Sequence, residues 1–192
     1  MKIGLFFGSF NPIHIGHLII AKQIVTQSDL DKVWFVVSPQ NPFKKRSNLI
    51  HEFDRFDMVR RAVYDDPQLE GSDVEFNLPK PSYTIDSLTY IAEKYPNDEF
   101  VLILGQDNLE HFHKWKNSEQ ILKYYKLIVY PRPNASANPL MDHENVTIVE
   151  APLLDISATF IRNRLKNSQS ISYLVPKEVE EFIIGKGLFK PK

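Results

Sequence analysis

The chain contains 192 residues and no cysteine, and its 23 Lys and Arg residues nearly balance 24 Asp and Glu residues, for a net charge of −1. The missing cysteine excludes thiol nucleophiles, iron–sulfur clusters and cysteine zinc sites, and the near-zero charge argues against a protein that coats nucleic acid. With 43% hydrophobic and 24% charged residues, the composition is typical of a globular protein. We therefore expect a single domain over residues 1–192, with a core that needs no disulfide or structural metal.

Short β-branched or aromatic runs alternate with stretches of helical period along the chain. The runs predict the strands Ile3–Phe7, Val33–Val37, Phe100–Leu104, Leu127–Val129, Val146–Val149 and, on a weaker pattern, Val74–Phe76. The periodic stretches predict the helices Ile15–Val25, Glu52–Tyr64, Ile85–Tyr95, Ser118–Tyr124, Ser157–Leu165 and a last one from Pro176 to Gly185. Strands and helices in alternation pair in parallel through crossovers, so the sequence predicts an α/β fold with a doubly wound parallel sheet and a small helical C-terminal part.

Two segments lack such periodicity. Residues Pro39–Ser47 include the basic run Lys44-Lys45-Arg46 and follow a predicted strand, at the edge where open α/β sheets bind ligands. Residues Pro131–Asn145 hold three prolines and three asparagines and predict a surface loop. The apolar run near the N-terminus is too short for a signal peptide or a membrane span, so we expect a soluble cytoplasmic protein with no membrane partner.

Only seven glycines occur, and two of them lie in the segment Gly8-Ser9-Phe10-Asn11-Pro12-Ile13-His14-Ile15-Gly16-His17. Gly8 permits close approach of the backbone to a ligand, and Gly16 removes a side chain from the first helical turn. His14 and His17 are three residues apart, near a helix N-terminus that favours anions. The combination suits a polyphosphate, although each histidine alone is more often a surface or core residue. The spacing matches neither a P-loop nor a dinucleotide fingerprint, and two histidines without further ligands predict no metal site.

A second candidate anion site lies at the start of a late helix. Ser157 is suited to cap the helix, Thr159 adds a hydroxyl group, and Arg162 places a permanent cation on the same side. The alternative is an ordinary capped helix with a solvated arginine.

The first segment resembles the G-[ST]-F-[DN]-P-x-H-x-G-H signature of the nucleotidyltransferase superfamily, which implies a Rossmann-like fold and transfer of a nucleotidyl group from a nucleoside triphosphate. This motif alone leaves open pantetheine-phosphate adenylyltransferases, cytidylyltransferases and mononucleotide adenylyltransferases. It also leaves open class I aminoacyl-tRNA synthetases, but the chain is too short for these and lacks their second signature.

Further motifs select one branch. The segments that match it are Ser82-Tyr83-Thr84-Ile85-Asp86-Ser87-Leu88, Gly105-Gln106-Asp107-Asn108-Leu109 with Phe112 and Trp115, Tyr130-Pro131-Arg132-Pro133, Ile156–Arg162, and Tyr173–Ile183. They resemble bacterial nicotinate mononucleotide adenylyltransferases over nearly the whole chain. The sequence departs from that pattern at Phe7, where many relatives have glycine, at Phe43, which replaces a histidine before Lys44, and at Ala158, which lacks a hydroxyl group.

The resemblance implies that ATP transfers its adenylyl group to nicotinate mononucleotide, giving deamido-NAD and pyrophosphate in NAD biosynthesis. A phosphate monoester has a second pKa of about 6, so the attacking phosphate needs no general base. The implied catalytic residues are His14, His17, Lys44 and Arg162. The implied ATP-binding residues are Gly8, Ser9, Phe10, Asn11, His14, Gly16, His17, Gly105, Asp107, Ser157, Thr159 and Arg162. The implied mononucleotide-binding residues are Ser9, Lys44, Ser82, Tyr83, Thr84, Trp115 and Arg132.

Trp115 offers a flat face for a pyridine ring, and Asp107 can accept hydrogen bonds from a ribose or a base. The expected cofactor is Mg²⁺ carried with ATP, and the expected partners are the two small substrates, without nucleic acid and with a homo-oligomer left open. The alternatives are an enzyme acting on nicotinamide mononucleotide or pantetheine phosphate, and a non-catalytic nucleotide-binding sensor.

Overall fold

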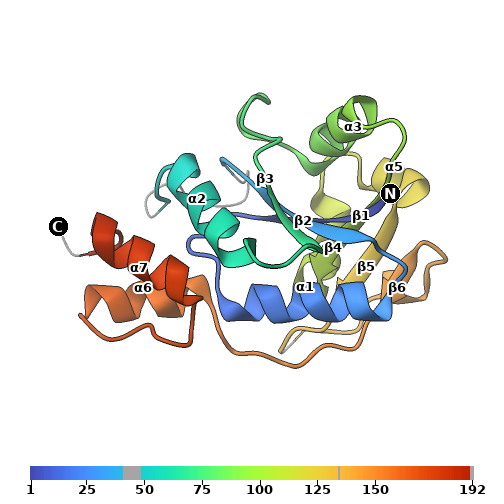
Figure 1. Cartoon of the computed structure of the whole chain (residues 1–192). Coiled ribbons are helices and arrows are strands. Elements are labelled where there is room, and N and C mark those ends of the chain that lie inside the picture. The colour runs from blue at the N-terminus through green and yellow to red at the C-terminus, as the bar shows by residue number, and fades with distance from the viewer. Residues whose placement is uncertain (41–48, 134, 191–192) are drawn as a thin grey trace.

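The computed structural model describes residues 1–40, 49–133 and 135–190. Six strands form one parallel sheet in the order β3-β2-β1-β4-β5-β6 (Figure 1). Their bounds are β1 Lys2–Gly8, β2 Lys32–Val37, β3 Leu69–Ser72, β4 Glu99–Gly105, β5 Lys126–Tyr130 and β6 Val146–Ile148. The chain builds outward from β1 to β3 and then returns to the other side of β1 with β4. The order of the strands therefore reverses between β1 and β4, which is the position where open α/β sheets bind ligands.

Helices cover both faces of the sheet. They are α1 Ile15–Gln27, α2 Glu52–Val63, α3 Thr84–Lys94, α4 Gln106–Glu110, α5 Ser118–Tyr124, α6 Ala158–Lys166 and α7 Lys177–Lys186, with short 3-10 helices η2 Phe112–Lys114 and η3 Pro139–Asp142. Helices α1, α2, α6 and α7 contribute to one hydrophobic core, and α3, α4 and α5 to the other. In Figure 1, α1 lies below the sheet and α3 and α5 lie above it, and α7 packs against α2.

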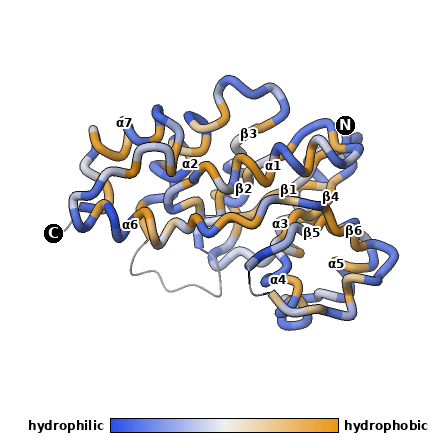
Figure 2. The backbone as a smooth tube through the Cα atoms, turned by 90° about the horizontal axis from the view of Figure 1, so that it is seen from below, coloured by the Kyte–Doolittle hydropathy of each residue, from blue (hydrophilic) through white to orange (hydrophobic). Residues whose placement is uncertain are grey.

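Adjacent residues of a strand point to opposite cores, as the pleat requires. Along β1, Leu5 joins the core beneath α3 to α5, while Phe6 joins the core beneath α1 and α2. Because both faces are covered, the strands are apolar throughout instead of alternating, which made them recognisable in the sequence. In Figure 2 the outer loops are largely hydrophilic, while the central strands include long hydrophobic stretches.

The α/β fold with a doubly wound, Rossmann-like parallel sheet is confirmed, and so are the predicted helices and five of the six predicted strands, within a few residues at their ends. The strand prediction for Val74–Phe76 is wrong. These residues form a turn in which the Phe76 N–H donates to Asp73 O over 2.8 Å, and the strand is β3 at Leu69–Ser72. This edge strand buries only Leu69, so it carries too few apolar residues to predict a strand.

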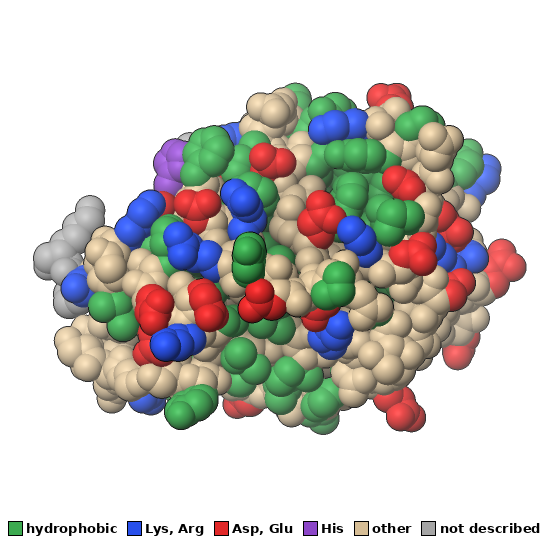
Figure 3. All heavy atoms as spheres, in the orientation of Figure 1, with side chains coloured by type: hydrophobic (Ala, Val, Ile, Leu, Met, Phe, Trp, Pro, Cys, Tyr) green, Lys and Arg blue, Asp and Glu red, His purple; other side chains and the backbone are tan. Residues whose placement is uncertain are grey.

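Two loop predictions have different outcomes. The predicted loop Pro131–Asn145 contains η3 at Pro139–Asp142. The basic run Lys44-Lys45-Arg46 lies outside the described residues. On the face shown in Figure 3, acidic and basic side chains are interspersed, as the near-zero net charge suggests. No helix within the described ranges is long and apolar enough to cross a membrane.

Candidate active site

Two adjoining cavities lie where β1, β4 and β5 end. The first, of about 470 Å³, gathers these residues expected from the sequence: Gly8, Ser9, Phe10, Asn11, His14, His17, Asp107, Arg132, Ser157, Thr159 and Arg162. We name it the histidine cavity. The second, of about 400 Å³, gathers Ser82, Tyr83, Thr84, Gly105 and Trp115, and we name it the tryptophan cavity. Phe6, Phe7, Asn108 and Tyr130 line both, so ligands in the two cavities would be neighbours.

The loop after β1 has little freedom. A Cβ atom at Gly8 would lie 2.7 Å from the ring of Phe10, which excludes larger residues there. Phe10 adopts a φ of 42°, in the left-handed region, and its buried ring lies 5.1 Å from the ring of His17 and 5.4 Å from that of Phe35. Packing of the Phe10 ring against other aromatic rings therefore fixes the loop, and the loop lines the histidine cavity.

His14 and His17 are brought together as a stacked pair. Their ring centroids are 3.7 Å apart with an angle of 26° between the planes. His14 is the residue before α1, and its backbone N–H donates to His17 Nδ1 over 3.2 Å. Gly16 lines neither cavity, but a Cβ atom there would approach His14 Nδ1 to 3.1 Å. Gly16 thus makes room for the imidazole of His14.

The buried ring of His14 is neutral at neutral pH. Burial lowers its pKa from 6.5 to about 4, and the positive charge of Arg132 contributes in the same direction. Its Nδ1 atom has no hydrogen-bond partner in the part of the chain that the structure describes. An entering polyanion would supply both a partner and a negative charge, which would favour the protonated ring.

The start of helix α6, in the C-terminal part of the chain, forms one wall of the histidine cavity. The Ser157 hydroxyl accepts from the Phe160 N–H over 3.2 Å, which confirms Ser157 as the residue that caps α6. Arg162 donates to Asn11 O over 2.8 Å and to Thr159 Oγ1 over 3.0 Å. These bonds fasten α6 to the loop after β1, so the two anion sites expected from separate motifs share one cavity. Partial burial lowers the pKa of Arg162 from its usual value.

Residues that follow β4 and β5 also line the histidine cavity. Arg132 Nε lies 3.6 Å from Asp107 Oδ1, and both residues line the histidine cavity. Gly105 ends β4, where a Cβ atom would overlap the Asp107 carboxylate and approach the Tyr130 ring to 3.2 Å. From the family resemblance we expect Arg132 at the mononucleotide and Gly105 at ATP. In the structure Arg132 lines the histidine cavity and Gly105 the tryptophan cavity.

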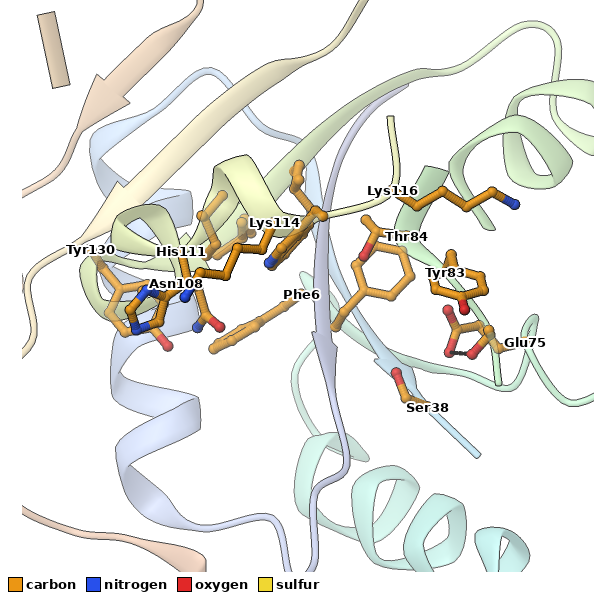
Figure 4. A pocket seen from close by; sticks show the side chains of 17 residues that line it. Phe6, Ser38, Glu75, Tyr83, Thr84, Asn108, His111, Lys114, Lys116 and Tyr130 are labelled. Carbon is orange, nitrogen blue, oxygen red and sulfur yellow. Dashed lines mark hydrogen bonds between the residues drawn. The ribbon is translucent and has the colours of Figure 1, made fainter. Parts of the chain in front are cut away.

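The tryptophan cavity has an aromatic wall and a helix start (Figure 4). The Trp115 ring packs 5.3 Å from that of Phe112, which is buried. Across the cavity, Tyr83 and Thr84 form the start of α3, and no side-chain hydrogen bond from Tyr83 caps this helix. Lys116 lies 2.8 Å from Asp86 Oδ2, with its ammonium group 4.9 Å from the Tyr83 ring centre.

Two buried charged residues near the cavities were missed by the sequence analysis. Arg55 is fully buried on the same helix face as Met58 and Val59, and that apolar spacing was the available signal. Glu75 is 2% exposed and lines the tryptophan cavity, but it lies in the turn mistaken for a strand. Lys44, expected to contact phosphate, lies outside the described residues.

Comparison with known proteins identifies the family of the chain. The model of the cytidylyltransferase-like family matches residues 5–164. A protein of Cytophaga hutchinsonii named "Probable nicotinate-nucleotide adenylyltransferase" is 63% identical over 186 residues, 97% of each chain. A protein of Flavobacterium psychrophilum with the same name is 47% identical over 192 residues, 99% of this chain and 100% of its own length.

The fold is shared with a solved structure of low sequence identity. Plasmodium falciparum nicotinic acid mononucleotide adenylyltransferase complexed with NaAD superposes with a TM-score of 0.83 at 20% identity, covering 98% of this chain and 97% of its own. The Rossmann-like sheet and its flanking helices are thus common to both. With the matches to the curated relatives over almost their whole length, the chain belongs to the cytidylyltransferase-like nucleotidyltransferases and, within them, to the nicotinate-nucleotide adenylyltransferase family.

Proposed function

We propose that the protein transfers the adenylyl group of ATP to the phosphate of nicotinate mononucleotide, forming deamido-NAD and pyrophosphate in NAD biosynthesis. The observation that carries this proposal is the pair of adjoining cavities, one with cationic and helix-start groups suited to a polyphosphate, the other with an aromatic wall suited to a pyridine ring. The names of the relatives with 63% and 47% identity support the same reaction.

The histidine cavity is the proposed ATP site. Two segments line it: the end of β1 with the following loop, at Gly8, Ser9, Phe10 and Asn11, and the start of α6, at Ser157, Thr159 and Arg162. A helix N-terminus carries unpaired N–H groups and partial positive charge, so the start of α6 favours phosphate oxygens. Asp107 is placed to accept hydrogen bonds from hydroxyl or amino groups of the nucleotide.

The reaction forms a bond between a phosphate oxygen of the mononucleotide and the α-phosphorus of ATP, and it breaks the bond to the β-phosphate. The attacking phosphate is ionised at neutral pH, so the residues act by aligning two anions and by neutralising the charge that builds on pyrophosphate. His14, His17 and Arg162 are the proposed donors. Neutral His14 would gain a proton as the polyphosphate enters.

The tryptophan cavity is the proposed site of the nicotinate ring, with Trp115 as the stacking surface. The start of α3, at Tyr83 and Thr84, would attract the nicotinate carboxylate because its N–H groups lack a side-chain cap. A neutral carboxamide would gain less from this positive end, which favours the acid over the amide. Arg132, at the border of the histidine cavity, is proposed to reach the mononucleotide phosphate. The proposed roles of Lys44 and Ser9 at the same phosphate rest on the family resemblance.

Nucleotidyl transfer from ATP generally uses a divalent metal ion, and we propose Mg²⁺. Among the described residues, no three His, Asp or Glu side chains converge to hold an ion. The donor set fits an ion that arrives with ATP and is coordinated mainly by phosphate oxygens and water. A cytoplasmic location also remains a prediction, which imaging of a fluorescent fusion would test.

The decisive experiment is a pyrophosphate-release assay with ATP, Mg²⁺ and one acceptor at a time. The acceptors are nicotinate mononucleotide, nicotinamide mononucleotide and pantetheine phosphate. We expect the highest kcat/KM with nicotinate mononucleotide. No release with any acceptor, despite measurable ATP binding, would indicate a nucleotide sensor instead, and a higher kcat/KM with another acceptor would replace the proposed substrate.

A further inference from the structure

Glu75 is a buried carboxyl group in the wall of the tryptophan cavity, and the reaction described above gives it no role. It is 2% exposed. The Ser82 hydroxyl donates to its Oε2 over 2.9 Å, and the Ser87 hydroxyl donates to its Oε1. Ser38 lines the same cavity, and its side chain favours the charged form of this carboxyl group. Figure 4 shows Glu75 beside Tyr83, with Ser38 below them.

The three serines come from two elements that border the cavity. Ser38 directly follows β2, and its N–H donates to Gly8 O over 2.9 Å. Ser82 lies just before α3, and Ser87 lies in the first turn of α3, where its N–H donates to Tyr83 O over 3.1 Å. The Glu75 carboxyl group therefore ties Ser82 and Ser87, at the start of α3, to the turn after β3.

A carboxyl group is a costly choice for this purpose. Burial raises the pKa of Glu75, although hydrogen bonds from the serine hydroxyls favour the charged form. An apolar side chain could fill the same space without the loss of hydration, but it could not orient several hydroxyl groups. The arrangement thus favours a defined geometry of the attached segments over the greatest stability.

The segment that Glu75 holds, residues 82–87, includes residues that line the tryptophan cavity. Tyr83 and Thr84 lie between Ser82 and Ser87, so the two hydrogen bonds to Glu75 bracket the residues that line the cavity. We propose that Glu75 is a positioning residue for the mononucleotide, which holds Ser82 and Ser87 and thereby fixes the start of α3 as a wall of the tryptophan cavity. The identity of the ligand rests on the proposed function.

The test compares Glu75→Gln with the double variant Ser82→Ala/Ser87→Ala. Glutamine keeps the volume but has one acceptor oxygen instead of two, so it cannot hold both hydroxyl groups as the carboxylate does. We expect the KM for nicotinate mononucleotide to rise about tenfold or more and the KM for ATP to change less than about twofold, because a displaced α3 start alters only one substrate site. The control is Asp66→Asn, because the Asp66 carboxylate also accepts from Lys22 and Gln68 but lines neither cavity.

Combining the substitutions tests whether Glu75 acts through the serines. If it does, the triple variant should have a mononucleotide KM within about twofold of the double variant, since the same interaction is lost only once. Binding of nicotinate mononucleotide alone, measured by titration calorimetry, should weaken in parallel with the KM.

The possible results separate the inference from the proposed function. If the wild-type protein does not turn over nicotinate mononucleotide, the proposed function is wrong and the inference falls with it. If the wild type does turn it over but Glu75→Gln changes the two KM values by the same factor, or lowers only the unfolding free energy, Glu75 is structural and the inference alone is overturned. Independent, multiplicative effects of Glu75→Gln and the serine substitutions would also overturn it.

Discussion

Replacing Arg55 with lysine should destabilise the protein by about 2–4 kcal/mol, although the substitution keeps a positive charge. The fully buried guanidinium donates to four backbone oxygens: Nε to Ile50 O over 3.1 Å, Nη1 to Ser9 O and Ser38 O over 2.7 Å each, and Nη2 to Pro39 O over 3.1 Å. Three nitrogen atoms of the guanidinium group donate these four hydrogen bonds. A lysine has a single nitrogen and cannot reproduce the planar fork, so about two of these bonds should be lost.

The magnitude follows from the cost of leaving buried carbonyl groups unpaired, which is about 1–3 kcal/mol each. Two such losses, taken near the lower end because the ammonium group can shift toward one carbonyl, give about 2–4 kcal/mol. For a chain of this length that corresponds to a fall in Tm of about 5–15 °C. Burial already lowers the pKa of Arg55 to about 10, which leaves it charged at neutral pH.

Urea unfolding followed by tryptophan fluorescence measures the effect, and an unchanged slope of unfolding free energy against urea would show that only stability changed. The control is Arg60→Lys on the same helix. Arg60 is exposed, with its guanidinium 5.9 Å from the Phe56 ring centre, and its replacement should cost less than about 0.5 kcal/mol. If Arg55→Lys were as mild as that control, the four hydrogen bonds would not hold these segments together.

Three further predictions concern the cavities. His17→Ala should lower kcat by about 10²–10³ while circular dichroism and Tm stay near wild type, and an unchanged kcat would remove His17 from the catalytic groups. Trp115→Ala should raise the KM for the mononucleotide about tenfold and that for ATP much less, so equal increases would contradict the stacking assignment. The native pKa of His14, about 4, lies below its unfolded value of 6.5, so His14 favours folding above pH 6.5 and loses this contribution as the pH falls toward 4. Between pH 7.5 and 5 the loss should be about 2 kcal/mol in urea unfolding, and His14→Asn should abolish that part of the pH dependence.

Most of the fold could be predicted because the sheet is covered on both sides. A strand such as β2 buries five consecutive residues, Val33–Val37, and this continuous apolar run is distinct from the helical spacing of Phe56, Val59 and Val63. The prediction failed at β3, because an edge strand of four residues with one buried side chain has no pattern of its own. Its position is determined by pairing with β2, which is a long-range interaction.

The candidate site could be predicted in part for a related reason. Parallel strands end at one edge, so motifs that follow β1 and β4 must meet there wherever they lie in the sequence. What the sequence does not contain is the partner of each polar group. Arg55 lies 46 residues from Ser9, whose carbonyl it binds, and Glu75 lies 12 residues from Ser87, in a turn whose apolar neighbours suggested a strand. The function of Gly16, which admits the His14 ring, is likewise visible only in three dimensions.

Both buried charged residues lie near Ser38. Its carbonyl accepts from Arg55, its side chain favours the charged form of Glu75, and its N–H donates to Gly8 O at the end of β1. Apolar packing is non-directional and leaves a loop backbone several nearly equivalent positions, whereas hydrogen bonds with defined angles leave few. Transfer between two phosphates requires the attacking and leaving oxygens to lie in line, and a displacement of about 1 Å can cost about 10²-fold in rate. The need for exact alignment explains why Arg55 and Glu75 are buried near the strand ends that border the cavities. The cores on the two faces of the sheet, where no such alignment is needed, are predominantly apolar.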